Sequence, residues 1–194
     1  MRNFRFGIDI DGTVTCPTSL IPHINKQFGC NLTLDDIKEY DLTKAFPVDE
    51  KIFFEWYQEA ESTIYDTSPA QAYAKEVLSG LSSQFELYYI SARGTNVYDG
   101  TLEWFKREEI PFDHIELLGS HHKIEAARKF EVHAFFEDKH DNAVDIHEEL
   151  DIPVILFDTP YNRKPIPEGV IRVSNWQDAN TWIKQLFPIE ESSR

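Results

Sequence analysis

Apolar residues alternate with other residues at the start of the chain. Four of them occupy every second position before an Asp-Gly pair: Phe4, Phe6, Ile8 and Ile10. Side chains of a strand point alternately to its two faces, so this spacing predicts a strand. The Asp-Gly pair is typical of a turn. The first element is therefore expected to be a strand that ends in a loop rich in carboxylates and hydroxyls.

From residue 69 onward, short apolar runs alternate with stretches of helical periodicity. The expected helices are Pro69–Leu81, Val97–Glu108, Lys123–Phe130, Asn142–Leu150 and Trp176–Phe187. The expected strands are Phe85–Ile90, His114–Leu118, Ala134–Phe136, Val154–Phe157 and Val170–Val173. Strands separated by helices of this length form parallel sheets, because each crossover must return across the sheet. The pattern predicts an α/β fold with a Rossmann-like, doubly wound parallel sheet.

The segment between the first strand and residue 69 has a different, aromatic-rich pattern. Its helical stretches are expected at Pro22–Phe28, Leu34–Glu39 and Asp49–Ser62. It is interpreted as a small helical cap, residues 16–68, inserted into an α/β core of residues 1–15 and 69–188. Residues 189–194 are expected to be a C-terminal tail.

The net charge of the chain limits the kinds of molecule that it can bind. The 194 residues include 19 basic and 34 acidic side chains, a formal charge of −15. Such a chain repels polyanions and lacks the basic surface that binds nucleic acid polymers. A small anionic ligand would need a local positive group.

Two further features of the sequence indicate the cellular compartment of the protein. The two cysteines, Cys16 and Cys30, suggest no disulfide framework. No apolar run approaches the roughly 18 residues of a membrane span, and the N-terminus lacks the pattern of a signal peptide. We expect a cytoplasmic protein without a membrane partner.

The loop after the first strand carries the first chemical motif, Asp9-Ile10-Asp11-Gly12-Thr13. Two acids at positions i and i+2 of an extended segment point the same way and can share a cation. Asp9 is a candidate nucleophile and Asp11 a candidate acid and base. Taken alone, the motif fits a helix cap or a calcium-binding turn equally well, although an EF-hand requires a preceding helix rather than a strand.

Three other strand ends carry polar residues that suit a phosphate. Ser91 follows the second strand and offers a hydroxyl to a phosphoryl oxygen. Lys123 precedes a helix and can neutralise the nucleophile and the transferring group. Arg93 is open to two interpretations: it holds the substrate, or it forms a salt bridge with a neighbouring acid.

The fourth strand end is Glu137-Asp138, directly after an apolar strand. Carboxylates there would complete the oxygen-rich shell that Mg²⁺ prefers. Asp138 is the expected ligand, and Glu137 is expected to act through water. Ligands of a doubly wound sheet bind beyond the carboxyl ends of the strands, so all four ends are expected to converge.

These four motifs, in this order, resemble those of haloacid dehalogenase superfamily phosphatases. The short helical cap after the first motif is similar to that of the 5′(3′)-deoxyribonucleotidases and bacterial nucleotidase relatives, as is the segment Asp36–Thr43. Glu137 stands where the deoxyribonucleotidases usually have an Asp.

The resemblance implies an enzyme that hydrolyses a nucleoside monophosphate through an aspartyl-phosphate, with Mg²⁺ as cofactor. The implied catalytic residues are Asp9 and Asp11, and the metal ligands are Asp9, Asp11 and Asp138. The expected substrate-binding residues are Gly12, Thr13, Ser91, Ala92, Arg93 and Lys123.

Alternatives remain open at this level. A cap of about fifty residues selects the leaving group, so a sugar phosphate or another small metabolite fits the same chemistry. A phosphorylatable receiver-like signalling module is a further alternative, although an acid at i+2 would hydrolyse the phosphate that a receiver must keep. Phe46 and Trp56 are first candidates for the leaving-group pocket. The oligomeric state is open, with a homodimer as one possibility.

Overall fold

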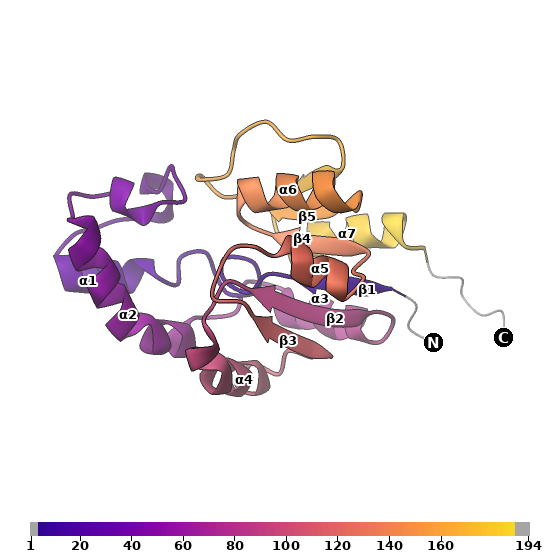
Figure 1. Cartoon of the computed structure of the whole chain (residues 1–194), viewed down its shortest axis with the longest axis horizontal. Coiled ribbons are helices and arrows are strands. Elements are labelled where there is room, and N and C mark those ends of the chain that lie inside the picture. The colour runs from indigo at the N-terminus through magenta and orange to yellow at the C-terminus, as the bar shows by residue number, and fades with distance from the viewer. Residues whose placement is uncertain (1–3, 189–194) are drawn as a thin grey trace.

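A six-stranded parallel sheet forms the centre of the structure (Figure 1). The computed structural model describes residues 4–188. The strands are β1 Arg5–Ile8, β2 Glu86–Ser91, β3 His114–Leu117, β4 Ala134–Glu137, β5 Val154–Phe157 and β6 Val170–Val173. They lie in the order β3-β2-β1-β4-β5-β6, so the order reverses between β1 and β4. Loops diverge at such a reversal and leave a crevice for a ligand.

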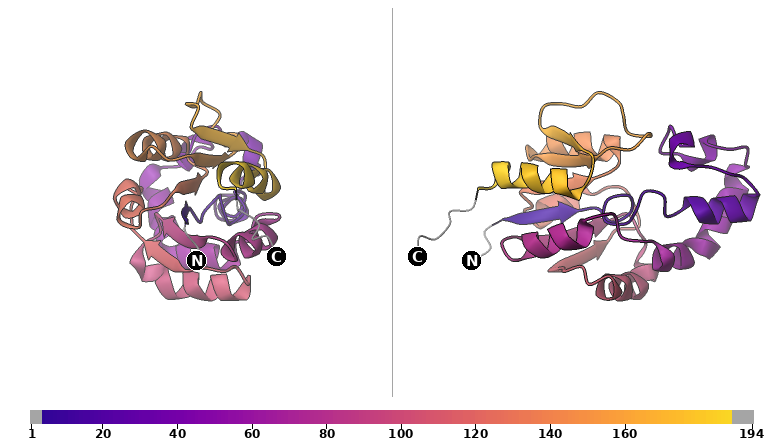
Figure 2. Two further views of the ribbon diagram at one scale, coloured as in Figure 1. Left: turned by 90° about the vertical axis from the view of Figure 1, so that its right-hand side faces the viewer. Right: turned by 180° about the vertical axis from the view of Figure 1, so that it is seen from behind.

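Helices cover both faces of this sheet (Figure 2). They are α1 Ile21–Phe28, α2 Glu50–Thr67, α3 Ala74–Ser82, α4 Tyr98–Arg107, α5 Ile124–Lys129, α6 His140–Leu150 and α7 Trp176–Leu186. Helices α3, α4 and α7 share an apolar cluster with Phe136 of β4, whereas α5 and α6 pack with its neighbour Phe135. Successive strand residues thus face opposite helical layers. The predicted α/β, doubly wound parallel fold is confirmed.

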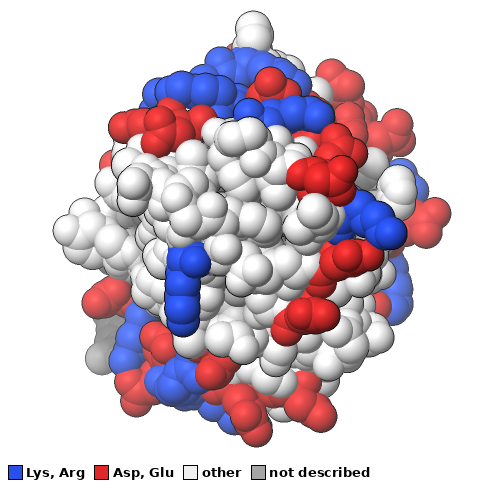
Figure 3. All heavy atoms as spheres, turned by 90° about the vertical axis from the view of Figure 1, so that its left-hand side faces the viewer, with Lys and Arg blue, Asp and Glu red and all other residues white. Residues whose placement is uncertain are grey.

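Helices α1 and α2 lie at one end of the molecule, beyond the sheet (Figure 1). Ile24, Phe46 and Phe53 form an apolar cluster there that is separate from the two clusters of the sheet. The space-filling view of this end has a broad, mostly uncharged centre with acidic and basic groups around it (Figure 3). A separate apolar cluster is what a segment needs to fold as a unit of its own, and we retain residues 16–68 as the proposed cap.

Two backbone segments run side by side where the cap meets the core. The N–H of Cys16 donates to the Pro69 carbonyl, and the N–H of Gln71 donates to the Val14 carbonyl, at 2.9 and 2.7 Å. Thr15 and Ala70 form an isolated antiparallel bridge between the same segments. The chain therefore leaves and re-enters the core through one short, hydrogen-bonded neck.

Three elements differ clearly from those expected, and the neck explains the first of them. Helix α3 begins at Ala74 rather than Pro69, because residues 69–71 are extended and paired with the outgoing segment. Helix α2 continues to Thr67, five residues beyond the expected end. The stretch expected to be helical at Leu34–Glu39 contains only a 3₁₀ turn, Leu34–Asp36. The predicted tail, residues 189–194, lies outside the described residues.

The aromatic packing of β1 gives a test of the fold. Phe6 is fully buried, with its ring 4.4 Å from that of Phe85 and 5.8 Å from that of Phe136. Phe6→Ala should leave a cavity and lower the free energy of unfolding by about 3–5 kcal/mol. Urea unfolding followed by circular dichroism measures the change. Phe54→Ala is the control: Phe54 is 57% exposed, and a change within about 0.5 kcal/mol is expected. Equal losses in the two variants would contradict the assigned core.

Candidate active site

Three buried carboxylates meet at the carboxyl ends of β1 and β4. Asp9 directly follows β1, Glu137 ends β4, and Asp138 comes next. The parallel register sets Ile8 beside Phe136, and the N–H of Asp9 donates to the Phe136 carbonyl at 2.9 Å. Each carboxylate offers an oxygen within 4.8 Å of the other two. The pairing of two adjacent strands therefore brings together acids that are about 130 residues apart in sequence.

Lys123, the residue before α5, lies inside this group. Its Nζ is 2.5 Å from Asp9 Oδ1 and 2.8 Å from Glu137 Oε2. Lys123 and the three acids are all buried, and none of them is more than 7% exposed. One lysine charge faces three carboxylates, so the ionised group carries a net charge of about −2, which is the charge that a divalent cation neutralises.

Burial dominates the acid–base behaviour of the group. Desolvation raises the pKa of Asp9 to about 7, although the nearby Lys123 ammonium opposes this change. Desolvation also raises the pKa of Asp138, and the charges of Asp9 and Glu137 add to the effect. Burial alone would lower the pKa of Lys123, but Asp9 and Glu137 outweigh it and raise the pKa. Lys123 thus stays charged, while Asp9 and Asp138 hold a proton or need another cation.

The donor atoms of the group fit a hard divalent metal ion. Asp138 Oδ1 is buried and has no hydrogen-bond partner among residues 4–188, whereas its Oδ2 accepts a hydrogen bond from the Tyr161 hydroxyl at 2.5 Å. A buried carboxylate oxygen without a partner is unfavourable unless a ligand satisfies it. Oxygen-only donors with excess negative charge are the set that Mg²⁺ selects.

The loop after β1 wraps tightly against this group. The N–H groups of Val14 and Thr15 both donate to the Ile10 carbonyl at 2.9 Å. Gly12 has φ +80°, and a Cβ at this position would lie 2.2 Å from Asp138 Oδ2. Both the backbone angle and the close approach require glycine. The hydroxyl oxygen of Thr13 is buried without a partner in the described part of the chain.

Asp11, the second acid of the motif, points elsewhere. Its carboxylate is bound by Arg93 through Nε and Nη2, each at 2.8 Å, and its side chain is 40% exposed. It does not belong to the group formed by Asp9, Glu137 and Asp138. Of the two interpretations open for Arg93, the salt bridge is the contact that the structure contains. Metal ligation by Asp11 and substrate binding by Arg93 stay predictions.

Ser91 and Ala92 stand at the end of β2, the strand adjacent to β1. The Ser91 hydroxyl is almost fully buried and accepts a hydrogen bond from the Arg93 N–H at 3.2 Å. Ala92 is half-buried beside it. Both residues therefore lie at the same edge of the sheet as Asp9, and their contact with substrate stays a prediction.

The loop after β5 supplies residues that sequence reasoning missed. The buried amide Nδ2 of Asn162 donates to the carbonyls of Asp138 and Phe157, at 2.6 and 2.7 Å. This amide and the Tyr161 hydroxyl fix the backbone and side chain of Asp138. A polar loop after an apolar strand was a signal available in the sequence, and it is the same signal that identified the other strand ends.

An aromatic rim lies beside the acids. The ring of Tyr40, from the cap, meets those of Tyr161 and His121 at 5.8 and 5.6 Å, and Lys139 Nζ lies 4.7 Å from its centroid. Phe46, a first candidate for the leaving-group pocket, instead packs on Phe28 within the cap cluster, and so does Trp56. Among the cap rings, Tyr40 is one that the described contacts bring beside Asp138 and its neighbour Tyr161.

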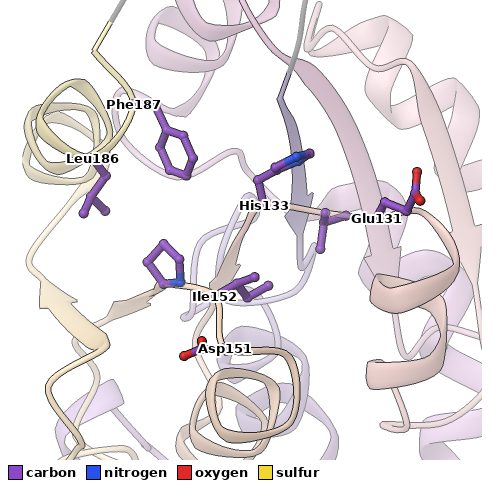
Figure 4. Close-up of a pocket in the computed structure, with 8 residues that line it drawn as sticks. Glu131, His133, Asp151, Ile152, Leu186 and Phe187 are labelled. Atoms are coloured by element: carbon purple, nitrogen blue, oxygen red, sulfur yellow. The ribbon is translucent and has the colours of Figure 1, made fainter.

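A hollow of about 550 Å³ occurs at the other end of the sheet (Figure 4). It is lined by Glu131, Val132, His133, Asp151, Ile152, Pro153, Leu186 and Phe187. Residues 131–133 and 151–153 precede β4 and β5, so this hollow lies at the amino ends of the strands. The acids follow the carboxyl ends, so the hollow is unrelated to the candidate site. No helix in residues 4–188 is both long and apolar enough to cross a membrane.

Solved structures define the fold class first. A haloacid dehalogenase-like hydrolase from Streptococcus pneumoniae matches with a TM-score of 0.67 at 15% identity, over 93% of this chain and 98% of that one. YfnB of Bacillus subtilis, solved with bound magnesium, matches with a TM-score of 0.63 at 12% identity, over 95% and 100% of the two chains. The chain has the haloacid dehalogenase-like hydrolase fold.

The particular family follows from sequence. Residues 3–187 match the family model described as 5′ nucleotidase, deoxy (Pyrimidine), cytosolic type C protein. A relative from Halalkalibacterium halodurans, named "Putative nucleotidase BH1399", is 48% identical over 181 residues, 93% of each chain. A protein named as a nucleotidase from Clostridium acetobutylicum is 30% identical over 99% of this chain and 100% of its own. The chain belongs to this nucleotidase family and is a phosphoric monoester hydrolase.

Gly12 provides a test of the site geometry. Gly12→Ala should strain the left-handed backbone and push the new methyl into Asp138, lowering the free energy of unfolding by about 1–3 kcal/mol and reducing phosphatase activity. Urea unfolding and a phosphate-release assay measure the two effects. In the matched control, Gly80→Ala in α3, the Cβ meets no heavy atom within 4 Å among the described residues. The control should gain about 0.5–1 kcal/mol and keep its activity. An active, stable Gly12→Ala protein would argue against the assigned loop.

Proposed function

We propose that this protein hydrolyses a nucleoside monophosphate with Mg²⁺ and forms an aspartyl-phosphate on Asp9. The observation that carries the proposal is the pairing of the buried Asp9 carboxylate with Lys123 beside Asp138, whose Oδ1 has no partner in the described part of the chain. A carboxylate oriented by a cation, beside an acid whose free oxygen can bind a metal ion, suits an in-line attack on phosphorus.

Lys123 selects the attacking atom of Asp9. Its Nζ binds Oδ1 at 2.5 Å, so Oδ2 is the oxygen left to act as nucleophile. In the first displacement, Oδ2 bonds to phosphorus as the ester P–O bond breaks. The electron pair leaves on the ester oxygen, which takes a proton from Asp11. The products of this half are the free alcohol and the aspartyl-phosphate.

The second displacement restores the protein. Asp11, now a carboxylate, takes a proton from water as the water oxygen bonds to phosphorus. The acyl phosphate P–O bond breaks, and its electron pair returns to Asp9. The sum of the two halves is ester plus water giving alcohol plus inorganic phosphate, with both acids back in their starting states.

Several groups would hold the phosphoryl oxygens during both steps. The Ser91 hydroxyl, the Thr13 hydroxyl and the backbone near Gly12 and Ala92 lie at the same edge of the sheet as Asp9. Neutral donors of this kind can bind a phosphate by hydrogen bonds. They carry no positive charge and so do not form ion pairs with the acids instead. Lys123 balances the nucleophile and the transferring group.

Mg²⁺ would be held by the carboxylates of Asp9 and Asp138, with Asp11 as the third predicted ligand. Glu137 Oε2 binds Lys123, and its Oε1 accepts the N–H of Lys139 at 3.2 Å, so Glu137 is expected to reach the ion through water. When bound, Mg²⁺ supplies positive charge that shields and polarises the phosphoryl oxygens.

The aromatic rim supports a nucleotide as substrate. Tyr40 is 43% exposed, and its ring stands against Tyr161 next to Asp138. A nucleobase can stack on such a ring, whereas a sugar phosphate, the alternative from sequence, lacks a flat face. Relatives named as nucleotidases favour the same choice. Membership in a hydrolase family also favours turnover over a receiver-like signalling role.

The nucleophile assignment is tested with Asp9→Asn. This variant cannot form the aspartyl-phosphate, so phosphate release from nucleoside monophosphates and from an aryl phosphate should fall below detection while the thermal transition persists. Asp99→Asn, an exposed acid of α4, is the control and should keep full activity. A panel of nucleoside and sugar phosphates assayed with Mg²⁺ identifies the substrate class. Turnover by Asp9→Asn would remove Asp9 from this role.

Metal binding and pH should be coupled. Burial raises the pKa of Asp9 from 3.8 to about 7, so the metal-free folded protein holds a proton that the unfolded chain releases. Its contribution to stability is present below pH 3.8 and is lost as pH rises to about 7. Mg²⁺ replaces this proton, so 5 mM Mg²⁺, on the order of a saturating concentration, should raise the melting temperature more at pH 8 than at pH 5.5.

Differential scanning fluorimetry of EDTA-treated protein measures this coupling. Asp138→Asn removes a proposed ligand and should abolish the Mg²⁺-dependent shift at both pH values. A Mg²⁺ shift that is the same at pH 5.5 and pH 8 would contradict displacement of the proton by the metal.

A further inference from the structure

Arg93 is, with Lys123, one of two buried cations next to the site in the described part of the chain. Its side chain has 0% exposure, while the Asp11 side chain that it contacts is 40% exposed. Nε and Nη2 bind the two oxygens of Asp11, each at 2.8 Å, and Nη1 donates to the Thr101 hydroxyl at 3.0 Å. The guanidinium is therefore fixed on all three of its nitrogens.

A buried arginine is unfavourable unless its charge is paired. The fork contact with Asp11 provides the pairing and also fixes the plane of the carboxylate, because two parallel hydrogen bonds prevent rotation. Each Asp11 oxygen keeps a lone-pair position that faces away from Arg93, where it can give or accept a proton. The ion pair compensates the arginine charge while Asp11 is ionised, as it is before it takes a proton from water, and the same contact keeps the plane of the acid fixed while Asp11 carries the proton for the leaving oxygen.

The other face of the guanidinium touches the cap. The Arg93 Cζ lies 3.9 Å from the ring centroid of Tyr65, in α2. The Tyr65 hydroxyl is 2.7 Å from that of Tyr57, which lies eight residues earlier in the same helix. Thr101 belongs to α4 of the core. Arg93 thus stands where a cap helix, a core helix and the loop of Asp11 meet.

From this geometry we propose that Arg93 is a positioning residue that acts through Asp11, and that Tyr65 of the cap holds Arg93 in place. This inference rests on the proposed function, in which Asp11 gives a proton to the leaving oxygen and takes one from water. It differs from the expectation that Arg93 binds the substrate phosphate, since the Arg93 side chain has 0% exposure and each of its three nitrogens already donates to a protein group.

Arg93→Lys is the main test. Lysine keeps the charge but loses the fork and the stacking face. With the nucleoside monophosphate found in the substrate panel, kcat should fall about ten- to a hundredfold, as expected for a displaced proton-transfer group. KM and the inhibition constant of inorganic phosphate should stay unchanged. A rise in KM and in the phosphate inhibition constant would instead assign Arg93 to the phosphate and overturn the inference.

Arg107→Lys is the matched control. Arg107 also joins α4 to α2, through its Nη1 and Asp66 at 2.7 Å, but it is 47% exposed and does not contact Asp11. This variant should keep kcat within about twofold of wild type, since an exposed ion pair contributes little. An equal fall in kcat for both variants would mean that any weakening of the cap–core junction slows the enzyme, which would overturn a specific role for Arg93.

A double-mutant cycle with Asp11→Asn tests whether Arg93 acts through Asp11. Single-turnover rates at high enzyme concentration are compared for Asp11→Asn with and without Arg93→Lys. We expect Asp11→Asn to lose about 10²- to 10⁴-fold, the range of general acid–base catalysis, and Arg93→Lys to cost nothing further. An additional loss as large as in the wild-type background would show independent action and overturn the inference.

Tyr65→Leu keeps the experiment decisive if Arg93→Lys fails to fold. It leaves the Arg93 charge and its two hydrogen bonds to Asp11 in place and removes the stacking ring together with the hydroxyl that bonds Tyr57. A smaller fall in kcat with unchanged KM is expected; unchanged kcat would overturn the role of the cap. Thermal unfolding of each variant is recorded alongside. Lack of any phosphate release by the wild-type protein would be seen before the variants are compared, and would overturn the proposed function together with this inference.

Discussion

The burial of three carboxylates around one lysine is the constraint on which the rest of the structure depends. Asp9, Glu137 and Asp138 cannot all be ionised in a water-poor environment unless cations compensate them, and Lys123 supplies only one charge. The parallel sheet is what forces the acids together, because β1 and β4 are adjacent and in register. The apolar clusters on both faces keep these strands from moving apart.

The supporting contacts are organised around the same constraint. Tyr161 and Asn162, from the loop after β5, hold the side chain and carbonyl of Asp138 and leave one carboxylate oxygen without a partner among the described residues. Gly12 allows the loop after β1 to approach that carboxylate more closely than any side chain would permit. These contacts orient Asp138 and leave its Oδ1 available, which is the arrangement expected of a preorganised metal ligand.

Much of this could be predicted from sequence, because the rule that parallel strands end at one edge is local. The apolar runs identify the strands, and the polar residues that follow them, such as Asp9, Ser91 and Asp138, are then placed at that edge without knowledge of the tertiary structure. The direction of each side chain is a different matter. That Asp11 turns to Arg93, 82 residues away, depends on where α2 and α4 leave room for a guanidinium. No periodicity encodes that choice. The late start of the helix expected from Pro69, which begins only at Ala74, has the same origin, since the pairing of residues 69–71 in the neck is tertiary.

The two buried cations compensate different acids. Lys123 is a compact charge shared by Asp9 and Glu137, and its pKa is raised, so it stays charged and is not free to bind a phosphate on its own. Arg93 is equally committed to Asp11. The two buried cations of the site are therefore both paired with carboxylates, in a chain whose formal charge is −15, and they add no net positive charge for a doubly charged phosphate. Within the proposed function, the metal ion must supply that charge, and neutral donors such as Ser91 can hold the phosphate only once the excess of the acids is neutralised. Within the proposed function, the carboxylate cluster thus makes phosphate binding conditional on the cation, and this is why acids, rather than arginines and lysines, would fill a site for an anionic substrate.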